Sequence, residues 1–212
     1  HQGFVSKLDR FSFDRCLRGV LRQRRIDYRC DVSGWRISME VHPSYRCRAW
    51  NRCFIGALST SIDEALMRKR VVILASGAGS LAQAIIDATD LEIQIVAVVS
   101  DNPNAQVLER AKAAQINTSV IEVGADRAAW NKQLFDQVDQ YQPDLVVSAG
   151  FMRILGSEFV HTFPTINSHP ALLPDFPGAH AVRDALAAGV TVTGTTVHWV
   201  DVGVDTGPII TQ

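Results

Sequence analysis

An alternation of short apolar runs with helical patterns, which begins near residue 70, is the feature that most constrains the fold. The runs VVILA (71–75), IQIVAVVS (93–100) and PDLVVSAG (143–150) are nearly continuous, as in strands that are buried on both faces of a sheet. Strands that alternate with helices of about 10–15 residues indicate an α/β fold, with a mostly parallel sheet and helices on both faces. The other expected elements are helices within 80–89, 103–115, 126–141 and 179–189 and strands at 118–123, 192–200 and 207–212.

The composition changes near Met67, which divides the chain into two unequal parts. Eleven arginines and a single lysine precede it, and so do all four cysteines, Cys16, Cys30, Cys47 and Cys53. No two cysteines have the C-x2-C spacing of a zinc module, so we expect no metal site in this part. We hypothesise that residues 1–66 are a non-native upstream segment and that residues 67–212 form the domain. An arginine-rich RNA-binding arm is the alternative, although seven acidic residues dilute its charge.

The overall charge and hydropathy argue against several kinds of partner. A net charge of −1 gives no whole-protein reason to bind nucleic acid or an acidic membrane surface. The apolar runs are far shorter than a membrane span, and the first residues lack the apolar core of a secretory signal. We therefore expect a cytoplasmic protein with no nucleic-acid or membrane partner, and the sequence leaves its oligomeric state open.

A glycine-rich loop joins the strand at 71–75 to the following helix. Gly77 and Gly79 let the backbone turn tightly and approach a ligand, while the free N–H groups at the helix start and the Ser80 hydroxyl suit a phosphate. The same loop also fits the dinucleotide-binding pattern G-x-G-x-x-A, with Ala82 as its last residue and Asp101 as the acid after the second strand. Phosphate binding and dinucleotide binding are both consistent with this loop.

The segment TINSHPALLPDFPG (165–178) places Asn167 and His169 two residues apart and follows them with three prolines. Side chains at i and i+2 of an extended segment point the same way, and proline restricts the backbone around it. Asn167 and His169 should therefore project together from a stiff strand end. A buried polar pair that closes a turn is the alternative interpretation of this segment alone.

Four segments in this order resemble the glycinamide ribonucleotide formyltransferase family, the folate-dependent enzymes of purine synthesis: SGAGSLAQAIID, DLVVSAGFMRIL, NSHPALLPDFPGAH and GTTVHWVDVGVDTGPIITQ. The resemblance covers about residues 68–212. It implies a Rossmann-like formyltransferase fold. It also implies transfer of the formyl group of 10-formyltetrahydrofolate, as co-substrate, to the amine of glycinamide ribonucleotide, without a metal.

The resemblance also implies roles for individual residues. Asn167, His169 and Asp205 would be the catalytic residues. His198 is expected to support them on a separate ground, because it lies in a β segment that faces the same region. The phosphate and ribose of the ribonucleotide would be held by Gly77, Ala78, Gly79, Ser80, Leu81 and Arg127. The folate would be held by Met152, Arg153, Ile154, Leu155, Val202 and Asp205.

The sequence departs from the family pattern in two places. Leu81 stands where the glycine loop often has asparagine, so a side-chain contact to the phosphate is lost while the backbone N–H remains. The chain stops at Gln212, where the family continues with a hairpin, a helix and an acidic residue that helps to hold the substrate amine. We therefore expect a C-terminally truncated domain, and a non-functional product is one alternative.

Other activities fit parts of the same pattern. A formyltetrahydrofolate hydrolase carries a similar Asn–His–Asp set but has no ribonucleotide phosphate to hold. A transformylase acting on a charged tRNA or a sugar nucleotide would need a basic or extended second domain. A non-catalytic NAD-binding module would use the glycine loop and leave Asn167, His169 and Asp205 idle. A metalloenzyme is not expected, because the spacings H-E-x-x-H and H-x-x-E-H are absent.

Overall fold

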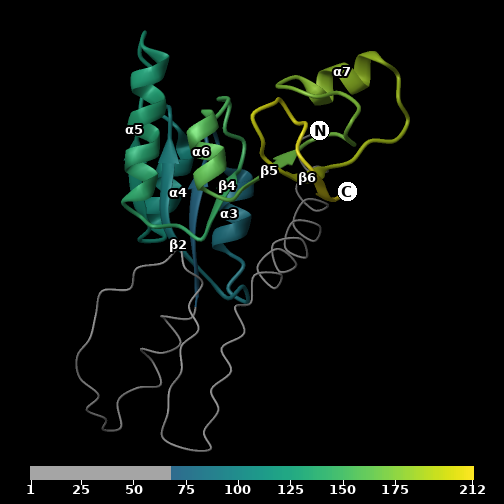
Figure 1. Cartoon of the computed structure of the whole chain (residues 1–212). Coiled ribbons are helices and arrows are strands. Elements are labelled where there is room, and N and C mark those ends of the chain that lie inside the picture. The colour runs from purple at the N-terminus through teal and green to yellow at the C-terminus, as the bar shows by residue number, and fades with distance from the viewer. Residues whose placement is uncertain (1–67) are drawn as a thin grey trace, which may run out of the picture.

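The computed structural model describes residues 68–212, which fold around one central sheet (Figure 1). The expected upstream segment, residues 1–66, lies outside the described residues, so the hypothesis about it stays a prediction. None of the helices within 68–212 is long and apolar enough to cross a bilayer.

Seven strands form the sheet in the order β3-β2-β1-β4-β5-β6-β7. The neighbouring pairs from β3 to β5 are parallel, whereas β6 pairs antiparallel with both β5 and β7. The predicted mostly parallel α/β sheet is therefore confirmed. The strands are β1 (Lys69–Leu74), β2 (Ile93–Ser100), β3 (Asn117–Val120), β4 (Leu145–Ser148), β5 (Thr165–His169), β6 (Thr196–Trp199) and β7 (Ile209–Thr211).

The helices are α3 (Ser80–Ile86), α4 (Gln106–Ala113), α5 (Arg127–Asp139), α6 (Ser157–Thr162) and α7 (Ala181–Ala187). Four of them lie within predicted segments, but α6 was not predicted. Its six residues are too few for a periodic pattern, Phe159 is its one fully buried residue, and its N-cap, Gly156, makes no side-chain cap. The strand expected at 192–200 is also shorter than predicted, since only Thr196–Trp199 pairs with β5.

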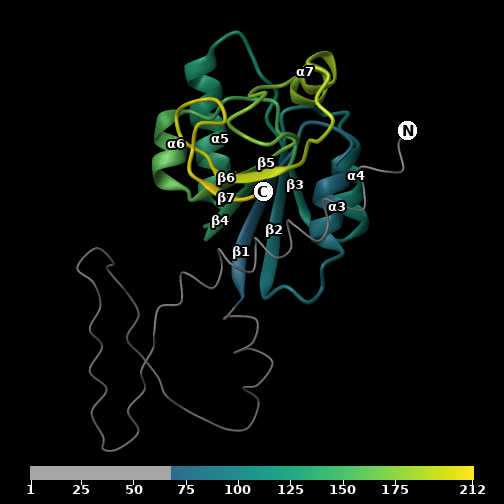
Figure 2. The same cartoon turned by 90° about the vertical axis from the view of Figure 1, so that its right-hand side faces the viewer.

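Helices cover both faces of the sheet because the side chains of β1 alternate between two cores. Val71 and Ile73 pack in the core that also contains buried residues of α3 and α4. Val72 and Leu74 pack in the opposite core, with buried residues of α5 and α6. Figure 2 shows α5 and α6 on one side of the strands and α3 and α4 on the other. This arrangement leaves the loops after the strands free at one edge.

Asp126 is the N-cap of α5. The side chain of Asp126 accepts hydrogen bonds from the backbone N–H groups of Ala128 (2.9 Å) and Ala129 (3.0 Å). It thus satisfies two of the donors that the first turn of a helix leaves without a partner.

Asp126→Ala should lower the free energy of unfolding by about 1 kcal/mol, because the two donors lose their acceptor. Urea unfolding of the full chain measures the change. Asp136→Ala is the matched control, since it makes the same substitution on the exposed side of α5 and removes only an ion pair with Lys132. Equal losses for the two variants would contradict the role of the cap.

Candidate active site

The loops that follow β1, β4 and β5 meet at the carboxyl edge of the parallel strands, where α/β proteins bind their ligands. The glycine loop is residues 76–80, the FMRIL loop is residues 151–155, and the proline loop is residues 170–178. A fourth, the Asp205 loop (residues 200–206), connects β6 to β7.

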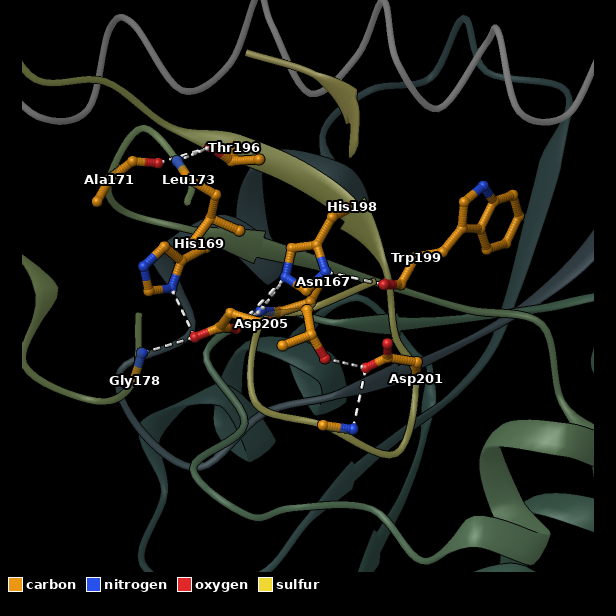
Figure 3. A network of polar contacts seen from close by, with 12 residues as sticks. Asn167, His169, Ala171, Leu173, Gly178, Thr196, His198, Trp199, Asp201 and Asp205 are labelled. Carbon is orange, nitrogen blue, oxygen red and sulfur yellow. Dashed lines mark hydrogen bonds and ion pairs between the residues drawn. The ribbon is translucent and has the colours of Figure 1, made fainter. Parts of the chain in front are cut away.

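The structure brings Asn167, Asp205 and His198 together across β5 and β6 (Figure 3). Asn167 and His198 are directly opposite each other in the antiparallel register of these strands. The Asn167 Nδ2 atom lies 3.2 Å from His198 Nε2 and 3.4 Å from Asp205 Oδ1. The predicted supporting position of His198 agrees with these contacts, although its role in catalysis stays a prediction.

His169 is buried beside the same carboxylate. Its Nδ1 atom lies 3.3 Å from Asp205 Oδ2, and its Nε2–H donates to the carbonyl oxygen of Phe176 at 2.8 Å. Both ring nitrogens therefore face oxygen acceptors, and an imidazolium could donate to both, whereas a neutral ring can donate to only one. In this geometry the carboxylate of Asp205 can orient the His169 ring.

Asp205 is held in a backbone conformation that is rare for a residue with a side chain. Its φ is +56°, and its Oδ2 atom accepts a 2.7 Å hydrogen bond from the N–H of Gly178, whose φ is +90°. Asp201 supports the turn before it, since its carboxylate accepts from the Gly203 N–H at 3.0 Å and the Thr206 hydroxyl at 2.8 Å. Residues in such conformations concentrate at functional sites.

The Nε2 atom of His198 lies near two possible partners, Asn167 and Asp205. Nδ1–H donates to the Trp199 carbonyl at 2.8 Å, so Nε2 accepts from Asn167 when the ring is neutral and donates to Asp205 when it is protonated. Burial opposes the charge, but the bonds to Asp205 and Trp199 and the nearby carboxylates of Asp205 and Asp201 raise the pKa of His198. The protonated form, paired with Asp205, is the one that these contacts favour.

The pKa of Asp205 shifts in the opposite direction. The hydrogen bond from His198 is the largest cause and lowers the pKa of the carboxyl; burial opposes it, while the Gly178 N–H and the nearby imidazoles lower it further. The carboxylate form is therefore stabilised at the centre of the site.

Thr196, which the sequence analysis did not single out, fixes the proline loop to β6. Its hydroxyl donates to the Ala171 carbonyl at 2.7 Å and accepts from the Leu173 N–H at 3.0 Å, and Gln212 also donates to it at 3.0 Å. Thr196 is fully buried and precedes His198 by two residues, the spacing of side chains on one face of a strand. That spacing was the signal available in the sequence.

Packing against α4 determines the shape of the glycine loop. Gly79 has a φ of +71°, and a Cβ atom there would lie 2.4 Å from the side chain of Val107, so the position requires glycine. The Gly77 carbonyl accepts from the Val107 N–H at 3.2 Å, and the Ala78 carbonyl accepts from Arg110 Nε at 2.8 Å. Arg110 is a second residue that sequence reasoning missed.

The start of α3 is suited to an anion. Ser80 is its exposed first residue, the half-buried Leu81 follows, and Gly79 provides no side-chain cap for the first N–H groups. The first turn contains no acidic residue. Free N–H groups and the helix dipole favour negative charge at such a position.

The glycine loop also anchors the FMRIL loop. The Ser76 N–H donates to the Gly150 carbonyl at 3.1 Å, and the Met152 N–H donates to the Ser76 hydroxyl at 2.9 Å. Hydrogen bonds thus connect the glycine loop, which is predicted to hold the ribonucleotide, to the FMRIL loop, which is predicted to hold the folate.

Arg127 contacts the FMRIL loop. Its guanidinium donates to the Ile154 carbonyl and, at 3.2 Å, to the side chain of Asn131, and it lies 4.4 Å from the centre of the Trp130 ring. None of these contacts is with the glycine loop, beside which the family resemblance predicts Arg127.

The side chains of the FMRIL loop divide into exposed and buried ones. Met152 (61% exposed) and Ile154 (58%) present apolar surface, as does Val202 (60%) in the Asp205 loop. Leu155 is instead buried in the core that contains Phe151, so a ligand would meet its backbone rather than its side chain. Exposed apolar side chains beside polar groups are typical of a site for an organic ligand.

The dinucleotide-binding alternative depends on Asp101 as the acid that binds the ligand. In the structure this carboxylate is not free to bind a ligand through both of its oxygens. Its side chain is 2% exposed, and its Oδ2 atom pairs with Arg153 Nε at 2.6 Å. Among residues 68–212, no group of three or more His, Cys, Asp or Glu side chains is arranged to hold a metal ion.

Residues 69–212 match the sequence profile of the formyl transferase family. A phosphoribosylglycinamide formyltransferase of Mycobacterium tuberculosis is 48% identical over 149 residues, which cover 68% of this chain and 69% of that protein. Its Escherichia coli counterpart is 44% identical and is matched over 70% of its length, with 67% of this chain covered. The crystal structure of glycinamide ribonucleotide transformylase 1 from Symbiobacterium toebii has a TM-score of 0.66 and 39% identity, covering 69% of this chain and 72% of that one.

The pKa of Asp205 is lowered and the pKa of His198 is raised, and together these shifts predict how the stability of the fold depends on pH. The lowered pKa of Asp205 adds stability above its ordinary pKa of 3.8, which is lost as the pH falls through the folded-state pKa. The raised pKa of His198 adds stability that is complete below its ordinary pKa of 6.5 and is lost as the pH rises through the folded-state pKa.

The gap in unfolding free energy between wild type and Asp205→Asn should therefore be largest between about pH 4 and 6.5 and smaller on both sides. Urea unfolding across this range measures it. Asp136→Asn, on the exposed side of α5, is the control and should show no such maximum. A gap that does not change with pH would contradict the coupling of Asp205 to His198.

Proposed function

The chain belongs to the formyl transferase family, and on this premise we propose that it transfers the formyl group of 10-formyltetrahydrofolate to the amine of glycinamide ribonucleotide in purine synthesis. The family resemblance predicted from the four sequence segments is confirmed. The observation that carries the proposal is the convergence of Asn167, His169 and Asp205 at the strand edge that also bears the glycine loop. The cytoplasmic location stays a prediction.

The proposed reaction joins the substrate amine nitrogen to the formyl carbon and then breaks the bond from that carbon to the folate nitrogen. A tetrahedral intermediate with a negatively charged oxygen lies between the two steps, and one proton passes from the attacking to the leaving nitrogen. The Asn167 amide can donate to this oxygen without a change of charge. For His169 to donate as well, its Nε2–H exchanges the Phe176 carbonyl for the substrate oxygen.

Asp205 would keep this arrangement in place through the reaction. Its carboxylate faces the Nδ1 atom of His169 and so stabilises an imidazolium, while its other oxygen lies near Asn167 and His198. A water held by the same carboxylate would complete the route for the proton.

The two substrates would approach from different loops. The phosphate of the ribonucleotide suits the glycine loop, for the reasons of charge and backbone geometry given above. The folate suits the exposed Met152, Ile154 and Val202, whose apolar surfaces can contact a flat ring. Arg127 contacts the FMRIL loop. This contact supports a position of Arg127 beside the folate more than the predicted position beside the ribonucleotide.

The hydrolase is the nearest alternative, since it would use the same three polar side chains with water in place of the amine. The loss of 10-formyltetrahydrofolate, followed with and without glycinamide ribonucleotide, separates the two activities. We expect loss that requires the ribonucleotide, because the glycine loop serves no substrate of a hydrolase. Equal loss without the ribonucleotide would support the hydrolase instead.

His169→Ala and Asp205→Asn should each reduce the transfer rate by on the order of a hundredfold or more, because each removes a group that stabilises or orients the transition state. Binding of glycinamide ribonucleotide, measured by calorimetry, should remain close to wild type. Ser168→Ala is the matched control, because Ser168 lies between Asn167 and His169 on the opposite face of β5. Wild-type turnover in either variant would falsify the assignment.

A further inference from the structure

Asp101 is a buried acid that the mechanism above does not use. It follows the last residue of β2, and the Nε atom of Arg153 in the FMRIL loop lies 2.6 Å from its Oδ2. The pair is 52 residues apart in the chain and joins the end of β2 to the loop after β4, across β1, which lies between these strands.

The second oxygen of Asp101 makes the pair costly for the fold. Oδ1 is buried and has no hydrogen-bond partner among the described residues. A buried carboxylate with one unsatisfied oxygen loses solvation that a single ion pair does not fully restore. An apolar side chain would fill this position with less loss, so the pair calls for a reason other than stability.

The way in which Arg153 is held suggests that reason. Asp101 contacts the guanidinium through Nε, and the Arg153 side chain remains 43% exposed. Holding an arginine by Nε fixes the plane of its guanidinium and leaves the terminal nitrogens for another acceptor. Asp101 therefore orients Arg153 without occupying the end of its side chain.

The backbone of the FMRIL loop has a separate anchor. Ser76 binds the backbone at Gly150 and Met152 on either side of Phe151. Loss of Asp101 should therefore leave the path of the loop intact and release the Arg153 side chain alone.

We propose that Asp101 is a positioning residue for the formyl donor, which it serves by holding Arg153 in the orientation that binds 10-formyltetrahydrofolate. This inference rests on the proposed function and deepens it. Asp101 acts through Arg153 and touches neither the reacting atoms nor the ribonucleotide.

The first test is Asp101→Asn in the full chain, which removes the charge with little change of shape. The KM and the calorimetric Kd for 10-formyltetrahydrofolate should rise by about tenfold, as for the loss of one charge-assisted hydrogen bond. The kcat and the KM for glycinamide ribonucleotide should stay near wild type, because the transition-state groups are untouched. A general loss of structure would instead change all of these constants together.

Two variants of Arg153 test the coupling and do not depend on how well Asp101→Asn folds. Arg153→Lys keeps the charge but lacks the Nε–H that Asp101 binds, so it should raise the donor KM and Kd as much as Asp101→Asn. In an Arg153→Met background, adding Asp101→Asn should change the donor Kd no further. Asp144→Asn is the matched control, since it breaks the pair of Asp144 with Lys69 and should leave donor binding unchanged.

A wild-type donor Kd in Asp101→Asn or in Arg153→Lys would overturn the proposal, and so would an undiminished effect of Asp101→Asn in the Arg153→Met background. An unaltered chain that neither binds 10-formyltetrahydrofolate nor transfers its formyl group would overturn the proposed function, and this inference with it. Transfer by the unaltered chain together with an unchanged donor Kd in the variants would overturn this inference alone.

Discussion

The carboxylate of Asp205 is the group on which the geometry of the site depends. One of its oxygens faces His169 and the N–H of Gly178, and the other lies near Asn167 and His198. These contacts join β5, β6, the proline loop and the Asp205 loop at a single point. A mostly buried carboxylate keeps its charge only where several donors surround it, so the same donors that lower its pKa also fix its position.

The parallel sheet provides the edge at which the side chains around Asp205 can come together. Strand β1 alternates its side chains between two cores, and helices on both faces leave the carboxyl edge as the place where the loops converge. Ser76 then connects the glycine loop to the FMRIL loop, Arg127 holds the FMRIL loop at Ile154, and Asp101 holds the side chain of Arg153. Neighbouring loops at one sheet edge thus share their anchors, which suits a site for two substrates.

Prediction from sequence succeeded where the signal was local and failed where it was not. Strand β2 occupies the predicted residues 93–100, because a continuous apolar run shows burial on both faces without reference to any partner. The helix α6 has one fully buried residue and no side-chain cap, so no local pattern marked it. The partners of Thr196 and Arg153 are 25 and 52 residues away in the chain, beyond the reach of any periodic pattern.

The sequence by itself determined the α/β order, the spacing that aims Asn167 and His169 to one side, and the family. Each of these follows from backbone geometry within a few residues or from motifs in a fixed order. Only the tertiary structure decided that His198 stands opposite Asn167, since that depends on β6 reversing beside β5. It also decided that the two histidines share one carboxylate, because the Asp205 loop is placed by packing and long-range hydrogen bonds.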